Sequence, residues 1–422
     1  MGGPRLVARP PLSDASAGRA DSPTSRFGWL LAALSVPAAV AAALLDPGGA
    51  RAAAVQDWPP FVLVAGLLLI GLVADDDGLF AVAGNRLARL ASGELATFCG
   101  AVVLVAAVTA ALNLDTSVAF LTPVLVHLAR RRRSEEAPLL YGCLLLSNAA
   151  SLLLPGSNLT NLIVLGHLHL SGGHFAARMA PAFGASVVTT ALVVILVHRR
   201  HFSTHRPRAL EPDVHIRSLT TAPNTLRAPD DDAPEPSKSL NGTLGAASVV
   251  AATLAVLLLR SPALAVAAVG AAATAVRLLQ RRERLAHVVE ILDAQVLIGL
   301  LGVAVALGTL ARSWTAPASL LAHLGSWATA AVAAVASVLL NNLPAASLLA
   351  ARVPPHPFSL LVGLNLGPNL FVTGSLSSFL WLKSARRAGA TPSVGRVTRL
   401  GVLVVPISMA GALGALAATG AH

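Results

Sequence analysis

Polar side chains stand in the middle of long apolar stretches at four places in this chain. These four polar breaks are residues 113–117 (NLDTS), 155–161 (PGSNLTN), 341–344 (NNLP) and 365–369 (NLGPN). Polar groups at membrane depth cost free energy, and they usually mark a path for a substrate or an ion. Helices that break at mid-membrane in corresponding positions of two halves point to a transporter's binding site.

The side chains at and just after the polar breaks are mostly amides and hydroxyls, which donate and accept hydrogen bonds without a fixed charge. They suit a small hydroxylated solute, an oxyanion-like solute or a partly dehydrated cation. Asp115 is the one carboxylate at a break, and a carboxylate at membrane depth is a candidate proton carrier. The alternative is that these residues only cap helices and hold turns. The candidate binding residues are Asn113, Asp115, Thr116, Ser157, Asn158, Thr160, Asn161, Asn341, Asn342, Asn365, Asn369, Thr373 and Ser375.

The composition is that of a membrane protein. Of the 422 residues, 55% are hydrophobic and 12% are charged, and an ordinary soluble domain is less apolar. Repeated apolar runs of about 18 residues or more predict several membrane helices. A net charge of +11 would suggest nucleic acid in a soluble protein, but here the basic residues flank apolar runs, and we expect no nucleic-acid partner. Cys99 and Cys143 predict neither a disulfide framework nor a zinc cluster.

The apolar runs form two halves joined by a polar segment. We expect a disordered cytoplasmic tail at 1–27, a first membrane half at 28–197, a polar cytoplasmic linker at 198–239 and a second membrane half at 240–422. One order of parts recurs at about 59–197 and 288–419: a plain span, two short arms around a polar tip, a broken span and a plain span. The expected fold is therefore an all-α polytopic membrane protein with two inverted repeats, each holding a re-entrant hairpin and a broken transmembrane helix.

The basic residues predict the orientation of these parts. If each pair of arms enters and leaves by one side and the N-terminus is inside, the cytoplasmic segments hold all 31 Lys and Arg residues except Arg51, Arg178, Arg260, Arg312 and Arg352. Basic loops stay cytoplasmic, so this bias favours nine full crossings and two re-entrant hairpins. We expect a multi-pass protein of the inner membrane, with a signal anchor at 28–45, a cytoplasmic N-terminus and an exterior C-terminus.

Two further expectations concern the plain spans that open the repeats. One plain span is expected at 288–310, and another begins at 61–74. The latter ends in Asp75, Asp76 and Asp77, for which interfacial anchoring is the favoured interpretation and a proton relay the alternative.

The sequences around the polar breaks resemble a known family. Residues 113–123 (NLDTSVAFLTP), 150–165 (ASLLLPGSNLTNLIVL), 340–344 (LNNLP) and 363–382 (GLNLGPNLFVTGSLSSFLWL) are similar to those of the arsenite/antimonite efflux permeases, the arsenical pump membrane proteins. That family lies in the ion-transporter superfamily, which includes dicarboxylate and citrate carriers. The resemblance covers most of both repeats.

The resemblance implies two inverted repeats, an elevator motion of a transport domain, and proton-driven efflux of As(III) or Sb(III), sometimes with a soluble ATPase. The chain also departs from the family pattern. Arsenical pumps often carry an acidic residue near position 148 and at 365, and a basic residue at 369, whereas this chain has Asn148, Asn365 and Asn369.

The chemistry of arsenic agrees with a carrier that uses no thiols. Trivalent arsenic held by a protein usually takes three thiolates, which two cysteines in one chain cannot supply. At neutral pH arsenite is an uncharged trihydroxide, which amides and hydroxyls bind weakly enough to release. We therefore expect proton-coupled export of arsenite or antimonite by a protein that is not an enzyme and has no cofactor, metal site or catalytic residues.

Two other functions stay open at this point. One is a carrier of another small solute, such as a dicarboxylate or an inorganic oxyanion, coupled to protons or to sodium. The other is the membrane channel subunit of an ATPase-driven pump; the chain itself has no phosphate-binding loop motif. The expected partners are the lipid bilayer, a small inorganic solute and its coupling ion, with a soluble ATPase and a second copy of the chain as further candidates.

Overall fold

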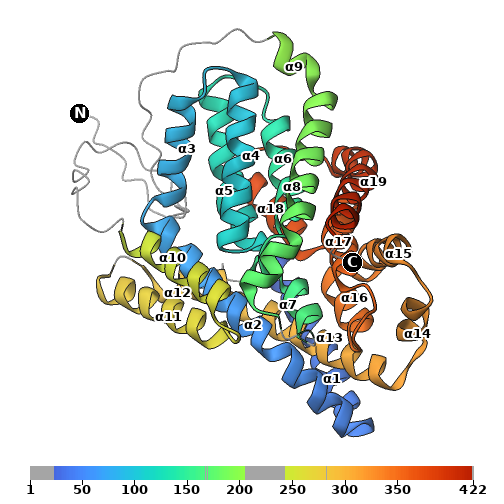
Figure 1. The fold of residues 1–422 in the computed structure, drawn as a ribbon. Coiled ribbons are helices and arrows are strands. Elements are labelled where there is room, and N and C mark those ends of the chain that lie inside the picture. Colours follow the sequence, from blue (N-terminus) through green and yellow to red (C-terminus); the bar gives the residue numbers. More distant parts are fainter. Residues whose placement is uncertain (1–22, 167, 169, 205–242, 282, 421–422) are drawn as a thin grey trace, which may run out of the picture.

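A computed structural model places residues 23–166, 168, 170–204, 243–281 and 283–420 (Figure 1). In this part of the chain all regular elements are helices, which confirms the all-α prediction. Residues 1–22 of the predicted tail and 205–239 of the predicted linker lie outside the described residues. The described ends of both segments are helical: α1 (Pro23–Leu45) begins inside the predicted tail, and α9 (Arg199–Thr204) lies inside the predicted linker.

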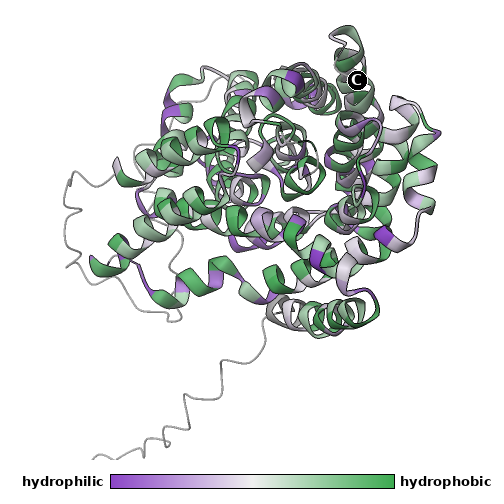
Figure 2. Cartoon of the chain, turned by 60° about the horizontal axis from the view of Figure 1, so that its bottom comes forward, coloured by the Kyte–Doolittle hydropathy of each residue, from purple (hydrophilic) through white to green (hydrophobic). Residues whose placement is uncertain are grey.

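Six helical stretches in the described part are long and apolar enough to cross a membrane. They lie in α1, α2 (Pro47–Asp76), α4 (Glu94–Ala111), α8 (Gly172–Val197), the consecutive α12 (Leu285–Leu292) and α13 (Ala294–Ser313), and α19 (Val394–Ala418). Shorter apolar helices are α6 (Ala137–Ala150), α10 (Thr243–Leu258), α11 (Ala263–Leu279) and α15 (Ser326–Leu340). Figure 2 shows hydrophobic residues along most of the helices, as a bilayer requires.

The two plain spans differ from their predicted limits. Helix α2 begins at Pro47, where Asp46 Oδ1 accepts a hydrogen bond from the Gly49 amide at 2.9 Å, and it continues through Pro59 and Pro60. The span expected at 288–310 lies within one apolar stretch long enough to cross a membrane, 285–313, in which Asp293 adopts a left-handed conformation (φ +40°) that separates α12 from α13. Aspartate tolerates this conformation better than most residues.

Helices end at each of the four polar breaks. The first and third breaks separate α4 from α5 (Leu114–Arg131) and α15 from α16 (Asn342–Leu349). The second lies between α6 and α7 (Leu159–Leu165), with the 3-10 turn η1 (Pro155–Ser157). The fourth lies between α17 (Pro357–Leu366) and α18 (Leu376–Arg387), with the turns η3 (Gly367–Leu370) and η4 (Val372–Gly374). Proline contributes to both broken spans because it lacks the N–H that a helix would use.

Corresponding helices of the two halves pack in corresponding ways. Helix α5 packs on α18 and α16 packs on α7, so each arm after a polar tip lies on the second part of the other half's broken span. Helices α4 and α6 pack together, as do α15 and α17, and α8 packs on α19. The short helices α3 (Leu79–Leu90) and α14 (Ala316–Ala322) pack on α5 and α16.

A second group of helices flanks those that carry the polar breaks. Its strongest contacts are α1 with α13, α2 with α11, α2 with α13, and α10 with both α2 and α11. Figure 1 shows this group as a diagonal layer led by α2, with α4–α8 and α15–α19 gathered on one side of it. The polar breaks therefore lie in a compact helical group that is braced by the layer of α1, α2, α10, α11 and α13.

Candidate functional site

Asn365 links the two broken spans through its side chain, which is fully buried. Its Oδ1 accepts hydrogen bonds from Asn158 Nδ2 at 2.7 Å and from Ser151 Oγ at 2.6 Å. Its Nδ2 donates to Asn161 Oδ1 and to the Leu361 carbonyl, each at 2.8 Å. These four bonds use both lone pairs and both N–H groups of the amide, so Asn365 fixes the second polar break against the fourth.

A second pair of amides joins the same two broken spans. Asn148 Nδ2 donates to Asn369 Oδ1 at 2.8 Å, and Asn369 Nδ2 donates to the Leu145 carbonyl at 3.2 Å. Asn161 Nδ2 donates to the Ser151 carbonyl at 2.7 Å. The last carbonyls of a helix lack intrahelical partners, and these amides bind carbonyls at the end of α6. We call Asn148, Ser151, Asn158, Asn161, Asn365 and Asn369 the amide network.

The first polar tip also reaches the second half of the chain. Asn113 caps α5, because its Oδ1 accepts from the Thr116 amide at 2.7 Å. Asp115 lies in the first turn of α5, where the helix dipole favours a negative charge. Ser377 Oγ, on α18, donates to Asp115 Oδ1 at 2.7 Å. The tip packs closely on α2, since a Cβ at Gly71 would lie 2.4 Å from the Thr116 methyl carbon.

The second polar tip, residues 341–344, contacts a residue of its own half of the chain. Asn341 has a φ of +78° and a ψ of 150°, a strained conformation that is mostly confined to glycine, and its Oδ1 accepts from the Leu343 amide at 3.4 Å. Its Nδ2 donates to the Thr373 carbonyl at 3.3 Å. Asn342 is buried beside it, whereas the Thr373 side chain is exposed.

The three remaining predicted residues also lie at helix ends. Ser157 Oγ accepts from the Leu154 amide at 3.3 Å and donates to the Ala110 carbonyl at 3.4 Å, which joins η1 to the end of α4. Ser375 caps α18 by accepting from the Ser378 amide at 3.3 Å. Thr160 is fully buried in the first turn of α7.

Among the candidate residues and the amide network, four buried polar atoms have no hydrogen-bond partner within the described part of the chain. They are Asn113 Nδ2, Thr116 Oγ1, Asn148 Oδ1 and Thr160 Oγ1. An unsatisfied buried polar group costs about 1–3 kcal/mol. These atoms are therefore the groups with unused capacity for a solute or a water molecule.

The structure brings some of the predicted residues into one network and leaves others in separate contacts. Asn158, Asn161, Asn365 and Asn369 meet in one network, Asp115 is joined to α18, and Asn341 and Thr373 meet separately. The candidate set omitted Asn148, Ser151 and Ser377. The first two lie three residues apart in the apolar run before Pro155, and that spacing places them on one helix face; this was the signal that could have found them.

The chemistry of the site is that of uncharged hydrogen-bonding groups. The amide network contains no Lys, Arg or His, and the only carboxylate among the candidate residues is Asp115. No group of three or more His, Cys, Asp or Glu residues that could hold a metal ion occurs in the part of the chain that the structure covers. Such a site can exchange hydrogen bonds with a polar solute.

Comparisons with known proteins fit this arrangement. The model of the citrate transporter family matches residues 26–364. The "Arsenical pump membrane protein" of Escherichia coli (strain K12) is 24% identical over 404 residues, which cover 90% of each protein. A second "Arsenical pump membrane protein" from Escherichia coli is 23% identical over 371 residues, covering 82% of this chain and 83% of the relative. The YdaH transporter structure from Alcanivorax borkumensis is 16% identical with a TM-score of 0.49, over 94% of this chain and 98% of that one.

The family model and the two arsenical pump relatives confirm the resemblance to the arsenical pump and ion-transporter proteins, at low identity. They also support an integral, multi-pass protein of the inner membrane. Because the family model spans most of the chain, including three of the four polar breaks, the protein belongs to the citrate transporter family and is a membrane transporter.

Proposed function

We propose that this transporter exports trivalent arsenic or antimony as the uncharged hydroxide, in exchange for protons. The observation that carries the proposal is the buried amide network around Asn365, which contains no cationic side chain. A neutral trihydroxide needs hydrogen-bond donors and acceptors but no countercharge. The arsenical pump membrane proteins that match this chain over most of its length support the same substrate class.

Binding must open the network in part, because the Asn365 amide already makes four hydrogen bonds. Asn148 Oδ1 and Thr160 Oγ1 have unused capacity and provide the first contacts for the solute hydroxyls. The solute then replaces amide–amide bonds with bonds of similar energy, so that binding is weak. A carrier needs this weakness, because it must release its solute on the other side.

The packing of the helices supports an elevator motion within two inverted repeats. Each arm after a polar tip lies on the other half's broken span, α5 on α18 and α16 on α7. In this proposal the two tips are re-entrant hairpins, and the group of helices that carries the breaks moves against the layer of α1, α2, α10, α11 and α13. The N-terminus lies in the cytoplasm and the C-terminus lies outside.

Asp115 is the proposed proton carrier of the exchange. Its contact with Ser377 joins the first tip to the second broken span, so a change in the charge of Asp115 acts on both repeats. The carboxylate is partly buried at the N-terminus of α5, within hydrogen-bond reach of Ser377.

Arsenite uptake into everted membrane vesicles tests this function. Vesicles with the protein should accumulate arsenite when a proton gradient is imposed, and a protonophore should abolish the accumulation. Vesicles without the protein are the control. Gradient-independent movement would remove the proton coupling, and no movement of arsenite or antimonite by folded protein would overturn the substrate. Measuring arsenite accumulation in the same vesicles with and without ATP tests for a soluble ATPase partner. The mass of the purified protein in detergent tests for a homodimer.

Transport of citrate or another carboxylate is the second candidate, favoured by the family model that matches the chain. Such a solute carries negative charges that the amide network would have to balance with N–H groups and helix dipoles alone. Radiolabelled citrate uptake into the same vesicles, under a sodium or a proton gradient, separates the two candidates. Saturable citrate uptake without arsenite movement would assign the carboxylate.

A further inference from the structure

Gln56 joins the layer of α1, α2, α10, α11 and α13 to the compact group of helices that carries the polar breaks. It lies on α2, and its Nε2 donates to the Ile163 carbonyl at 3.1 Å and to the Ala350 carbonyl at 3.4 Å. Ile163 belongs to the last turn of α7, and Ala350 is the C-cap of α16. The last carbonyls of a helix lack intrahelical N–H partners. One side-chain amide therefore binds the ends of two helices of the compact group.

The two helix ends come from different halves of the chain. Helix α7 is the second part of the first broken span, α16 is the arm after the second polar tip, and the two helices pack on each other. Gln56 binds them at the ends that are farthest from their polar breaks. A hydrogen bond is lost once donor and acceptor lie more than about 3.6 Å apart. Any displacement of the compact group against α2 by a few ångströms therefore breaks both bonds.

Arg312, on α13, fixes the direction in which the Gln56 amide points. Arg312 Nη2 donates to Gln56 Oε1, which leaves the N–H groups of the amide turned toward the helix ends. Arg312 Nη1 donates to the Gly308 carbonyl at 2.8 Å. A Cβ at Gly308 would lie 3.1 Å from Arg312 Nη1 and 3.7 Å from Asp57 Oδ2, so the guanidinium also lies near the Asp57 carboxylate, which is 2% exposed. Arg312 is thus held within the layer, and Gln56 carries the contact across to the compact group.

We infer that Gln56 is a positioning residue for transport, a clasp that holds the compact group in one end position against the layer. The inference rests on the proposed elevator motion, because the clasp is closed in this structure and must open whenever the group moves. Arg312 keeps the amide aimed at the same place, so that the clasp closes again when the group returns. The bonds of the clasp go to helix ends and not to the polar breaks, and it therefore acts whichever solute is carried.

Distances between two spin labels test the clasp in the full chain, without any solute. Leu264 on α11 and Val188 on α8 are 65% and 57% exposed, so labels on L264C and V188C report the separation of the layer from the compact group. The background is C99A, whose remaining native cysteine, Cys143, is buried. Protein with Gln56 should give one dominant distance. Q56M keeps an unbranched side chain without donors, and it should raise the ratio of a second distance to the first by about tenfold, the factor expected when ordinary hydrogen bonds are lost.

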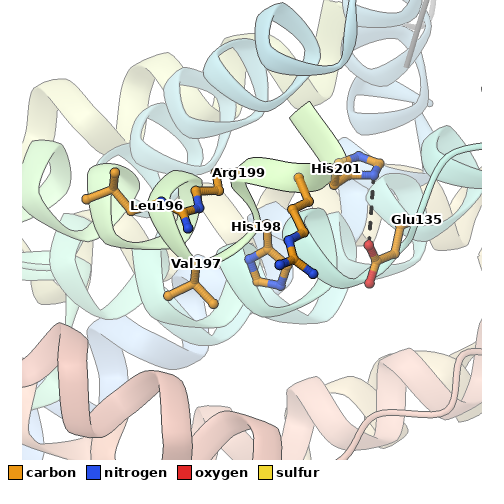
Figure 3. A pocket seen from close by; sticks show the side chains of 7 residues that line it. Glu135, Leu196, Val197, His198, Arg199 and His201 are labelled. Atoms are coloured by element: carbon orange, nitrogen blue, oxygen red, sulfur yellow. Dashed lines mark ion pairs between the residues drawn. The ribbon is translucent and has the colours of Figure 1, made fainter. Parts of the chain in front are cut away.

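Two variants are matched controls, because each removes a polar contact that does not cross the boundary between layer and compact group. Q280M acts within the layer, where Gln280 Oε1 accepts from Arg277 Nη1 at 3.0 Å. E135Q acts on the other side of the boundary. Glu135 lines a cavity of about 560 Å³ at the turn from α8 into α9, and its Oε2 lies 3.8 Å from His201 Nδ1 (Figure 3). Both controls should keep the distance distribution of the protein with Gln56.

A covalent replacement of the clasp separates its loss from misfolding. A Cβ at Gly166, the C-cap of α7, would lie 3.2 Å from Gln56 Cγ, which brings a cysteine pair within reach of a disulfide. Without spin labels, Q56C/G166C should lose uptake into vesicles on oxidation and recover it on reduction.

Three results would overturn the clasp: an unchanged distance ratio in Q56M, an equal rise in Q280M or E135Q, or full uptake by the oxidised Q56C/G166C pair. The distances are measured without solute. A failure of arsenite export would therefore contradict the proposed function and leave a changed ratio in Q56M as support for the clasp.

Discussion

The Asn158 side-chain amide donates to Asn365 Oδ1 at 2.7 Å, across 207 positions of sequence. The two residues belong to different halves of the chain, and each lies at the polar break of a broken span. Helix ends with unsatisfied carbonyls and amides cannot face lipid, so the two breaks cover each other. The contact explains why both halves are needed to form one site.

Replacing Asn365 with alanine should abolish transport and destabilise the protein. The change leaves Asn158 Nδ2 and Asn161 Oδ1 without a buried partner, while Ser151 Oγ keeps its bond to the Asn148 carbonyl. Unpaired buried groups cost about 1–3 kcal/mol each, and relaxation of the site makes about 2–4 kcal/mol the expected total. The measurement is thermal unfolding in detergent together with solute uptake. Asn85→Ala is the control, because Asn85 is a partly buried amide on α3, outside the polar breaks, whose Oδ1 accepts from Arg131 at 2.7 Å; an equal loss in both variants would contradict a special role of the network.

Replacing Asp115 with asparagine should uncouple transport from the proton gradient. Asparagine keeps an oxygen that accepts from Ser377 Oγ, so the local structure should be retained while the ionisable group is lost. Everted vesicles with Asp115→Asn should equilibrate arsenite but fail to accumulate it. Ser377→Ala is the matched control, since it removes the hydrogen bond and keeps the carboxylate, and it should accumulate arsenite at a reduced rate. Accumulation by Asp115→Asn at the wild-type level would remove Asp115 from the coupling step.

The location of the polar breaks could be predicted from sequence, but their pairing could not. Asn158 and Asn365 are conspicuous because each interrupts an apolar run, where a polar side chain costs free energy and usually marks a functional site. Their contact joins positions in different halves, and no local sequence pattern predicts which amide binds which. Ser377 was missed for the same reason, since its partner Asp115 is 262 positions away.

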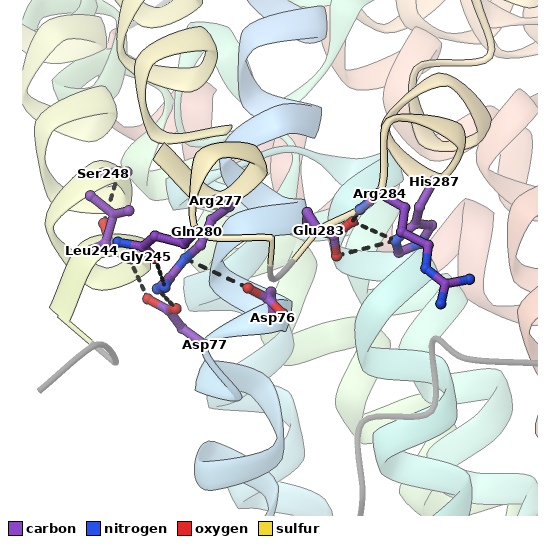
Figure 4. A network of polar contacts seen from close by, with 10 residues as sticks. All are labelled: Asp76, Asp77, Leu244, Gly245, Ser248, Arg277, Gln280, Glu283, Arg284 and His287. Carbon is purple, nitrogen blue, oxygen red and sulfur yellow. Dashed lines mark hydrogen bonds and ion pairs between the residues drawn. The ribbon is translucent and has the colours of Figure 1, made fainter. Parts of the chain in front are cut away.

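The burial of charged residues near the ends of spans could not be predicted from the sequence either. Arg277 was counted with the basic residues that flank the membrane, yet its side chain is only 1% exposed and is paired with Asp77 (Figure 4). Asp77 Oδ2 also accepts from the Gly245 amide at 2.7 Å. Asp77 is therefore paired within the protein, and the interfacial anchoring expected for the acidic cluster stays a prediction. Asp293 is a polar residue in its run, but the sequence does not show that the helix divides into α12 and α13 there.

Replacing Arg277 with methionine should destabilise the layer formed by α2, α10 and α11. Methionine is unbranched and fills part of the space of the arginine side chain, but it leaves the Asp77 carboxylate, also 1% exposed, without its countercharge. Removing one partner of a buried ion pair costs about 3–5 kcal/mol. The double variant Asp77→Asn/Arg277→Met should recover part of this loss in thermal unfolding. Arg281→Met, at an exposed position four residues further on, should have little effect; if it destabilised the protein equally, general charge loss would be the cause.

Adding a methyl group at Gly363 should separate α17 from α15 and weaken the site. A Cβ at Gly363 would lie 2.1 Å from the Ala330 carbonyl oxygen, so the two helices would have to move apart. Overpacking of this kind costs about 1–3 kcal/mol. Gly184→Ala provides a matched control within α8, because a Cβ there has no neighbour within 4 Å. Alanine also favours a helix over glycine by about 1 kcal/mol, so this variant should be unchanged or slightly more stable in thermal unfolding. Because α17 carries Asn365, Gly363→Ala should also lower solute uptake, whereas equal stability and uptake in the two variants would show that the close approach of α15 and α17 is not required.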